Sequence, residues 1–295
     1  MSAAEQTLSP RGRTLEIATG RAVRYVLETP PQAGAPLIVL EAGSFGFSAD
    51  WAAVQRRLAA AGLRSLAYDR AGLGFSAAGP FPRDSHSIAA DLEAVLEALA
   101  ETGPLILCGH SMAGLHLRVF AARNASRVRG VALIDAVTPE AMDHRWAAGI
   151  VGPFAAISRL AAWGASLGLQ RPLAGAFGDA IGLPADAKAE KQVAFSDPAH
   201  NRWAAAEIDA WDDDVAEARA AGPFDPAWPL AVVLTGDGRA PNPLHDIQSA
   251  PAGAARDGLV IHVRGANHAS LLGERHAGHI VRAIQSVAAA AAKAC

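Results

Sequence analysis

The pattern of apolar and polar positions divides the chain into short strands and longer amphipathic segments. Residues 13–18 and 21–27 alternate apolar and polar side chains, which predicts a half-exposed hairpin. Several continuous apolar runs follow, and such runs are typical of strands buried in a parallel sheet. These runs are residues 36–40, 63–68, 104–108, 131–134, 230–235 and 258–263. The sequence therefore predicts eight strands, most of them parallel.

Segments with helical periodicity lie between several of these strands. Residues 49–61, 87–100 and 115–122 predict helices in the first half of the chain, and residues 273–292 predict a helix after the last strand. Strands that alternate with helices form a mostly parallel sheet with helices on both faces, because each crossover places its helix against the sheet. The predicted fold class is therefore α/β.

The alternation of strands and helices stops after the sixth strand. Residues 138–226 are rich in alanine, glycine and tryptophan, and they predict helices whose boundaries the pattern does not define. We expect this insert to form a helical lid over the carboxyl ends of the strands, where open α/β sheets bind ligands. Residues 1–137 and 227–295 then form the core. The aromatic residues of the insert together predict a hydrophobic cavity beneath the lid.

Composition narrows the possible function classes. Of the 295 residues, 19% are charged and the formal net charge is −3, so nothing indicates a nucleic-acid-binding surface. Cys108 and Cys295 are too few for a disulfide framework or a cysteine metal site. The N-terminus lacks the apolar core of a signal peptide, and no apolar stretch is long and uncharged enough to span a membrane. We expect a cytoplasmic protein that needs no metal or organic cofactor; the sequence does not indicate its oligomeric state.

A serine at a sharp turn gives the first chemical signal. The segment Leu105-Ile-Leu-Cys-Gly-His-Ser-Met-Ala-Gly-Leu115 predicts a strand, a turn and the start of a helix, with Ser111 at the apex. This arrangement is a nucleophile elbow, which requires small residues two positions before and after the serine. Gly109 and Ala113 meet that requirement. A serine that only caps the helix would need neither the glycine nor the apolar strand before it.

Five motifs, in this order along the chain, resemble those of the α/β-hydrolase family. They are Glu41-Ala-Gly-Ser-Phe-Gly46, Asp69-Arg-Ala-Gly-Leu-Gly-Phe-Ser76, Gly109-His-Ser-Met-Ala-Gly114, Ile134-Asp135 and Gly265-Ala-Asn-His268. The resemblance covers nearly the whole chain except the insert. It implies an eight-stranded, mostly parallel α/β-hydrolase sheet with a lid inserted after the sixth strand, and a serine nucleophile activated by a histidine.

The resemblance assigns the catalytic roles. Ser111 is the candidate nucleophile, and His268 is the candidate base because it lies in the loop before the last helix, where the family places its histidine. Family members place the acid after the sixth or the seventh strand, so Asp135 and Asp237 both fit the chain order. We favour Asp135, because Asp237 follows Gly236 more closely than the family's usual spacing allows. The other aspartate is then an ordinary turn residue.

The resemblance also places an oxyanion hole. Its donors would be the backbone N–H groups of Met112 and Ser44, with Phe45 as the alternative to Ser44. Glu41 precedes this loop, and a carboxylate there would oppose an oxyanion, so we expect Glu41 to turn inward to a backbone N–H or to Arg70. The residues expected to line the substrate pocket are Phe45, Met112, Trp146 and Val137.

These residues predict a serine hydrolase that cleaves a carboxylic ester or lactone of a small-to-medium apolar acyl substrate through an acyl-enzyme. Amide or aminopeptidase activity, carbon–carbon bond hydrolysis, and a non-catalytic receptor for a small ligand are the alternatives. A peptidase would need an acidic pocket, which carboxylates of the insert could supply. These are Glu140, Glu207, Asp209 and Asp212 to Asp214. Epoxide hydrolases and dehalogenases are disfavoured, because their nucleophile is an aspartate at the position of Ser111.

Overall fold

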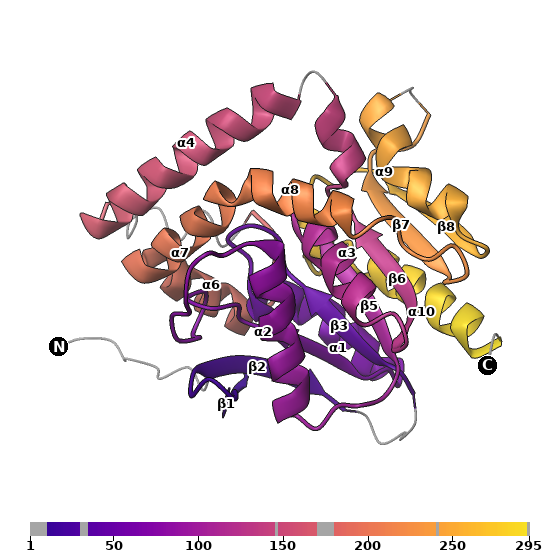
Figure 1. The fold of residues 1–295 in the computed structure, drawn as a ribbon, viewed down its shortest axis with the longest axis horizontal. Coiled ribbons are helices and arrows are strands. Elements are labelled where there is room, and N and C mark those ends of the chain that lie inside the picture. The colour runs from indigo at the N-terminus through magenta and orange to yellow at the C-terminus, as the bar shows by residue number, and fades with distance from the viewer. Residues whose placement is uncertain (1–10, 30–34, 145–146, 170–179, 240–241, 294–295) are drawn as a thin grey trace.

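The fold is built on one eight-stranded sheet, shown in Figure 1. The computed structural model describes residues 11–29, 35–144, 147–169, 180–239 and 242–293. The strands are β1 (Arg13–Glu16), β2 (Ala22–Glu28), β3 (Leu37–Glu41), β4 (Ser65–Tyr68), β5 (Leu105–His110), β6 (Val128–Ile134), β7 (Leu230–Thr235) and β8 (Gly258–Val263). All eight predicted strands are therefore confirmed, with ends shifted by a few residues.

The strand order sets the place of a ligand site. The order is β1-β2-β4-β3-β5-β6-β7-β8, and every pair from β4 to β8 is parallel, whereas β1–β2 and β2–β4 are antiparallel. The chain runs outward from β3 to β4 and then returns to place β5 on the other side of β3. Such a reversal opens a crevice at the carboxyl ends of the two strands. The loops after β3 and β5 meet there.

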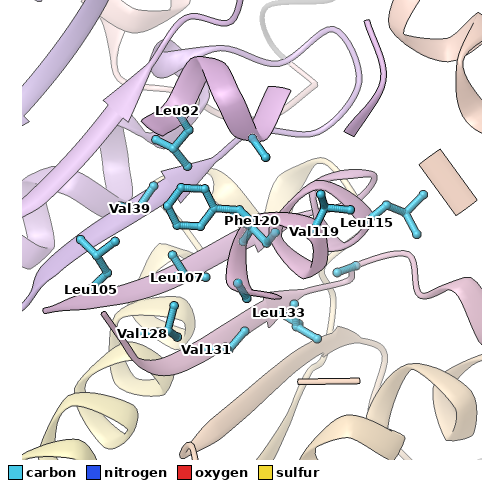
Figure 2. Packing of buried hydrophobic residues seen from close by; sticks show 14 of the residues in the cluster. Val39, Leu92, Leu105, Leu107, Leu115, Val119, Phe120, Val128, Val131 and Leu133 are labelled. Carbon is cyan, nitrogen blue, oxygen red and sulfur yellow. The ribbon is translucent and has the colours of Figure 1, made fainter. Parts of the chain in front are cut away.

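Alternating side chains of the strands feed two apolar layers. Leu37 and Val39 of β3 belong to one cluster, and Ile38 and Leu40 belong to the other. The first layer packs under α2 (Ser85–Ala98) and α3 (Ala113–Arg123), and Figure 2 shows Phe120 of α3 among the strand residues. The second packs under α1 (Ala52–Ala60) and α10 (Ala277–Lys293). Helices on both faces of the sheet are thus confirmed.

Helices also fill the described parts of the chain between β6 and β7. They are the short η2 (Pro139–Asp143), then α4 (Ala147–Ser166), α6 (Ala185–Ser196), α7 (Pro198–Asp209) and α8 (Trp211–Ala220). In Figure 1, α4 lies outermost at the top, and α8 packs against α2 and α3. The division of the chain at residues 138 and 226 stays a prediction. No helix in the described part of the chain is long and apolar enough to cross a membrane.

Buried ion pairs join α6 and α7 to the core. Arg70, in the loop after β4, lies 2.7 Å from Glu207 of α7. On α6, Glu190 lies 2.6 Å from Arg24, and the neighbouring Lys191 lies 2.8 Å from Asp50. All of these side chains are at most 7% exposed. Breaking such a pair on one side leaves a buried charge without its partner, so these contacts fix α6 and α7 on the core.

One helix was not predicted from the sequence. It is α9 (Pro243–Ala254), between β7 and β8, and it carries Pro251 inside it. The proline and the small residues around it obscure the helical pattern, but the start of the helix has a clear signal. Asn242 accepts hydrogen bonds from the N–H groups of Leu244 and His245, and Pro243 occupies the first helical position. Asparagine before proline is a common way to begin a helix.

Candidate active site

Ser111 occupies a strained turn between β5 and α3. Its φ angle is 58°, in the left-handed region that residues with a side chain rarely adopt. Two backbone hydrogen bonds hold this turn against the segment after β6: the Ser111 N–H donates to Ile134 O at 3.2 Å, and its carbonyl accepts from Val137 N at 2.9 Å. The serine is thus held at the carboxyl end of the sheet, as a nucleophile elbow requires.

The small residues around the elbow are needed for its packing. A Cβ at Gly109 would lie 2.7 Å from Leu117 Cδ1 and 3.2 Å from the Ala113 Cβ, so residues 109 and 113 face each other closely. A Cβ at Gly114 would lie only 2.3 Å from the carbonyl oxygen of Val137. The alanine at 113 and the glycine at 114 therefore meet two separate steric demands.

The structure brings His268 to Asp135 and not to Asp237. His268 Nδ1 lies 2.7 Å from Asp135 Oδ2, and the Asp135 backbone has a φ of 44°. Burial alone would raise the pKa of Asp135, but the hydrogen bond and charge of His268 outweigh it and lower that pKa below its ordinary value. Asp237 is exposed, and its carboxylate accepts from the Arg239 N–H at 3.1 Å, as a turn residue does.

Two more residues lie next to this pair, and neither was assigned a role from the sequence. The amide of Gln248, on α9, donates to Ala136 O at 3.0 Å and to Asp135 Oδ1 at 3.5 Å. The His110 ring lies 4.5 Å from the His268 ring, and its Nε2 is 3.0 Å from the His268 carbonyl oxygen. Burial lowers the pKa of His110 to about 3, so its neutral ring can donate to that carbonyl.

The loop after β3 lies directly beside the serine. A Cβ at Gly43 would lie 2.7 Å from the Ser111 Cβ, so only glycine permits this approach. Ser44 Oγ donates to the sulfur of Met112 at 3.5 Å, which ties the loop to the first turn of α3. Backbone N–H groups in the first turn of a helix have no partner within the helix, which suits them to bind an anion. Phe45 has a φ of 57°, and its carbonyl accepts from Lys191 at 2.9 Å.

Glu41 turns inward, as predicted. Its carboxylate accepts from Tyr68 Oη at 2.6 Å and from Arg70 Nη1 at 2.7 Å. Glu41, Tyr68 and Arg70 are all buried. The negative charge of Glu41 is therefore paired below the loop rather than presented to it.

An apolar cavity of about 330 Å³ opens beside Ser111. Its lining residues are Ser111, Asp135, Val137, Ala141, Met142, Val151, Phe154, Trp211, Leu244, Gln248 and His268. Val137, one of the residues expected in the substrate pocket, is among them. Phe45 and Met112 are not among the described lining residues: Phe45 stacks on Phe195 with ring centroids 6.1 Å apart, and the Met112 side chain is buried in the core. Trp146 lies outside the described residues.

Four carboxylates of the insert have other partners. Glu207 pairs with Arg70, Glu140 with Arg118 at 2.9 Å, and Asp209 with Arg159 at 2.8 Å. Asp214 is buried and accepts from Ser85 Oγ. Among the described lining residues the cavity has one carboxylate, Asp135, and it is bound to His268. Across the described ranges, no group of three His, Cys, Asp or Glu side chains is placed to hold a metal ion.

Two buried histidines should make the protein less stable below neutral pH. Burial lowers the pKa of both His110 and His200 to about 3. In the unfolded chain each histidine gains a proton near pH 6.5, whereas in the native state each stays neutral until about pH 3. Their contribution to stability is therefore complete above pH 6.5 and is lost as the pH falls toward 3. We expect the free energy of unfolding to fall by about 2 kcal/mol for each histidine between pH 7.5 and pH 5.

Urea unfolding at these two pH values measures the effect. In His200→Gln one of the two groups is gone, so the variant should lose about half as much stability as the wild type over the same interval. An equal loss in both proteins would show that His200 is protonated in the native state at pH 5.

Comparisons with known proteins identify the family and the fold. The family model for the alpha/beta hydrolase fold matches residues 36–230. An AB hydrolase superfamily protein of Gibberella zeae is 40% identical over 96 residues, which are 32% of this chain and 29% of that protein, so the match spans less than a third of that relative.

Two solved structures share the fold over almost their whole length. An enol-lactonase from Burkholderia xenovorans superposes with a TM-score of 0.65 at 22% identity, over 93% of this chain and 99% of that chain. A variant of an epoxide hydrolase from Vigna radiata superposes with a TM-score of 0.70 at 14% identity, over 94% of this chain and 99% of that chain. At such low identity the two likenesses concern the fold alone.

Proposed function

We propose a function for this chain on the premise that it belongs to the α/β-hydrolase family, whose model covers residues 36–230. The chain acts, in this proposal, as a serine hydrolase on a carboxylic ester or lactone with a small-to-medium apolar acyl group. The observation that carries it is the lining of one cavity by Ser111, His268 and Asp135, with His268 and Asp135 hydrogen-bonded at 2.7 Å.

Each of these three residues has a distinct role in the proposed reaction. Asp135 holds the proton of His268 on Nδ1, so Nε2 is free to take the proton of the Ser111 hydroxyl. The serine oxygen attacks the acyl carbon and forms a tetrahedral intermediate. His268 then gives its proton to the departing alcohol oxygen. Water attacks the resulting acyl-enzyme by the same steps and releases the acid.

Two backbone groups would stabilise the negative charge of the intermediate. Met112 is the N-cap residue of α3, so its N–H lies at the positive end of the helix dipole, which also favours an anion. The N–H of Ser44 lies in the loop that Gly43 brings against Ser111. The N–H of Phe45, in the next peptide of the same loop, is the alternative second donor.

The cavity supports an apolar acyl group. Apart from Gln248 and the three catalytic candidates, its described lining consists of apolar or aromatic side chains. A cavity of about 330 Å³ lies near the lower end of the range for small-molecule sites. Of the two solved structures above, one is named an enol-lactonase and the other an epoxide hydrolase. A serine at the elbow favours acyl transfer over epoxide opening, which uses an aspartate there.

An aminopeptidase is the weaker candidate. The amino terminus of a peptide is a cation, and the described lining offers it only Asp135, which His268 already occupies. Carbon–carbon bond hydrolysis and ligand reception without turnover remain as outcomes of the test below.

Fluorophosphonate labelling tests the nucleophile, and a substrate series tests the class. Peptide mapping after labelling should place one adduct on Ser111. Among p-nitrophenyl acetate, butyrate, hexanoate, decanoate and palmitate, we expect kcat/KM to be highest for butyrate or hexanoate, because longer chains exceed the cavity. A γ-lactone and an anilide serve as the comparison for ring opening and for amide cleavage. Stoichiometric labelling without turnover of any ester would instead favour carbon–carbon cleavage or a receptor.

A further inference from the structure

Arg70 makes an unusually complete set of contacts below the active site. The side chain is 1% exposed, and its guanidinium makes five hydrogen bonds, as many as it has N–H donors. Two go to the carboxylate of Glu207 at 2.7 and 2.8 Å, and one goes to Glu41 at 2.7 Å. The other two go to the carbonyl oxygens of Ala42 at 2.6 Å and Gly43 at 2.9 Å.

The last two contacts set the direction of the loop beside Ser111. In a trans peptide the N–H points opposite to the carbonyl of the same peptide unit. Because Arg70 holds the Gly43 carbonyl, the N–H of Ser44 must point away from Arg70. Gly43 itself lies against Ser111. Arg70 therefore selects one of the two ways in which the peptide between Gly43 and Ser44 could face.

We propose that Glu207 is a positioning residue of the active site: through Arg70 it holds the peptide between Gly43 and Ser44 in the orientation that an oxyanion hole requires. This inference rests on the serine hydrolase proposed above. Glu207 belongs to α7 of the insert, so the contact that docks α7 on the core also orients the peptide of the proposed oxyanion hole.

The paired hydrogen bonds between Arg70 and the carboxylate of Glu207 explain why glutamine at position 207 should not hold Arg70 in place. Two parallel hydrogen bonds from a guanidinium to a carboxylate fix its plane as well as its position. Glutamine at position 207 offers one acceptor oxygen, and its amide N–H₂ would face another donor of Arg70. The guanidinium would then tilt toward Glu41, its remaining carboxylate partner, and its hydrogen bond to the carbonyl oxygen of Gly43 would weaken.

A second buried ion pair supplies a matched control. Glu190 of α6 lies 2.6 Å from Arg24, and both side chains are at most 5% exposed. Arg24 contacts Ser48 and Asp69, and no hydrogen bond joins it to Ala42 or Gly43 among the described contacts. Glu190→Gln therefore removes a buried charge that anchors the insert without touching the loop beside Ser111.

The experiment compares Glu207→Gln with Glu190→Gln in the full chain. We expect both to lower Tm by similar amounts, since each leaves a buried arginine short of a partner. Only Glu207→Gln should lower kcat/KM for p-nitrophenyl butyrate, by about tenfold, because displacing a donor is milder than the 10²- to 10³-fold cost of removing one. Arg70→Lys keeps the positive charge but cannot form the paired hydrogen bonds of a guanidinium, so it should lower kcat/KM at least as much.

A pair of ketones separates this role from a general loss of packing. A butyl trifluoromethyl ketone adds the Ser111 hydroxyl and places an oxyanion in the hole, whereas the matching methyl ketone binds without an adduct. In Glu207→Gln the Ki of the first should rise about tenfold and that of the second should not change. An unchanged Ki for the trifluoromethyl ketone, or an equal loss of kcat/KM in Glu190→Gln, overturns the inference. Failure of the proposed function would look different, since the wild type would then take no label on Ser111 or would take the label and turn over no ester.

Discussion

Replacing Ser111 with alanine should abolish multiple turnover and lower kcat by about 10⁶-fold, the order of loss seen when a catalytic serine is removed from a serine hydrolase. Alanine leaves His268 and Asp135 in place but removes the oxygen that would carry the acyl group. The residual rate should match direct attack by water on substrate held in the cavity. Steady-state hydrolysis of p-nitrophenyl butyrate measures the change, and the burst of p-nitrophenol should vanish with it.

The control for Ser111→Ala is Ser249→Ala. Ser249 lies on α9, where its hydroxyl donates to the Asp246 carbonyl at 3.1 Å, and it is not among the cavity-lining residues. That variant should keep wild-type kcat and the wild-type adduct. Hydrolysis by Ser111→Ala at a tenth of the wild-type rate or more would mean that another group is the nucleophile.

Asp135→Asn should lower kcat by about 10⁴-fold, as in the worked serine-protease case where the acid of a triad becomes an amide. The asparagine amide can donate to Nδ1 of His268, which would move the ring proton to Nε2 and leave the base unable to take the proton of Ser111. Asp237→Asn changes an exposed turn residue and should leave kcat within about twofold. The two variants compared side by side measure which aspartate serves His268.

Their folded states provide the check on this comparison. Asparagine has nearly the same shape as aspartate, so the circular dichroism spectra and thermal melting curves of both variants should stay close to those of the wild type. Equal activity of Asp135→Asn and the wild type would contradict the assignment, whichever result Asp237→Asn gives.

The sequence could predict the sheet because strand signals in this chain are strong and local. The buried strands β3 and β5 are continuous apolar runs, and no competing signal interrupts them. The helix α9 was missed because Pro251 breaks its pattern, although Asn242 and Pro243 mark its start. The bounds of α4, α6, α7 and α8 could not be predicted because alanine-rich segments lack a clear division into apolar and polar faces.

Some residues of the candidate site could likewise be predicted from local sequence signals, and others could not. Ser111 could be found because its turn requires small neighbouring residues. His268 could be found because it lies in the loop between the last strand and the last helix. The choice of Asp135 over Asp237 depends on which loop reaches His268, and this is a property of the folded sheet. Gln248 could not be found, because its helix was not predicted. The walls of the cavity depend on how the insert packs, so the sequence did not single out lining residues such as Met142, Phe154 and Trp211.

The position of His268 after an edge strand links the His268–Asp135 contact to the stability of that strand. His268 follows β8, which among the described strands pairs only with β7, and most side chains of β8 are half-exposed or exposed. Its partner Asp135 is 133 residues earlier in the chain. Edge strands with few buried contacts open more readily than the centre of a sheet. Local opening of β8 would therefore separate His268 from Asp135 while the rest of the molecule stayed folded. In the proposed hydrolase, the free energy of that local opening would then limit the active fraction before global unfolding does.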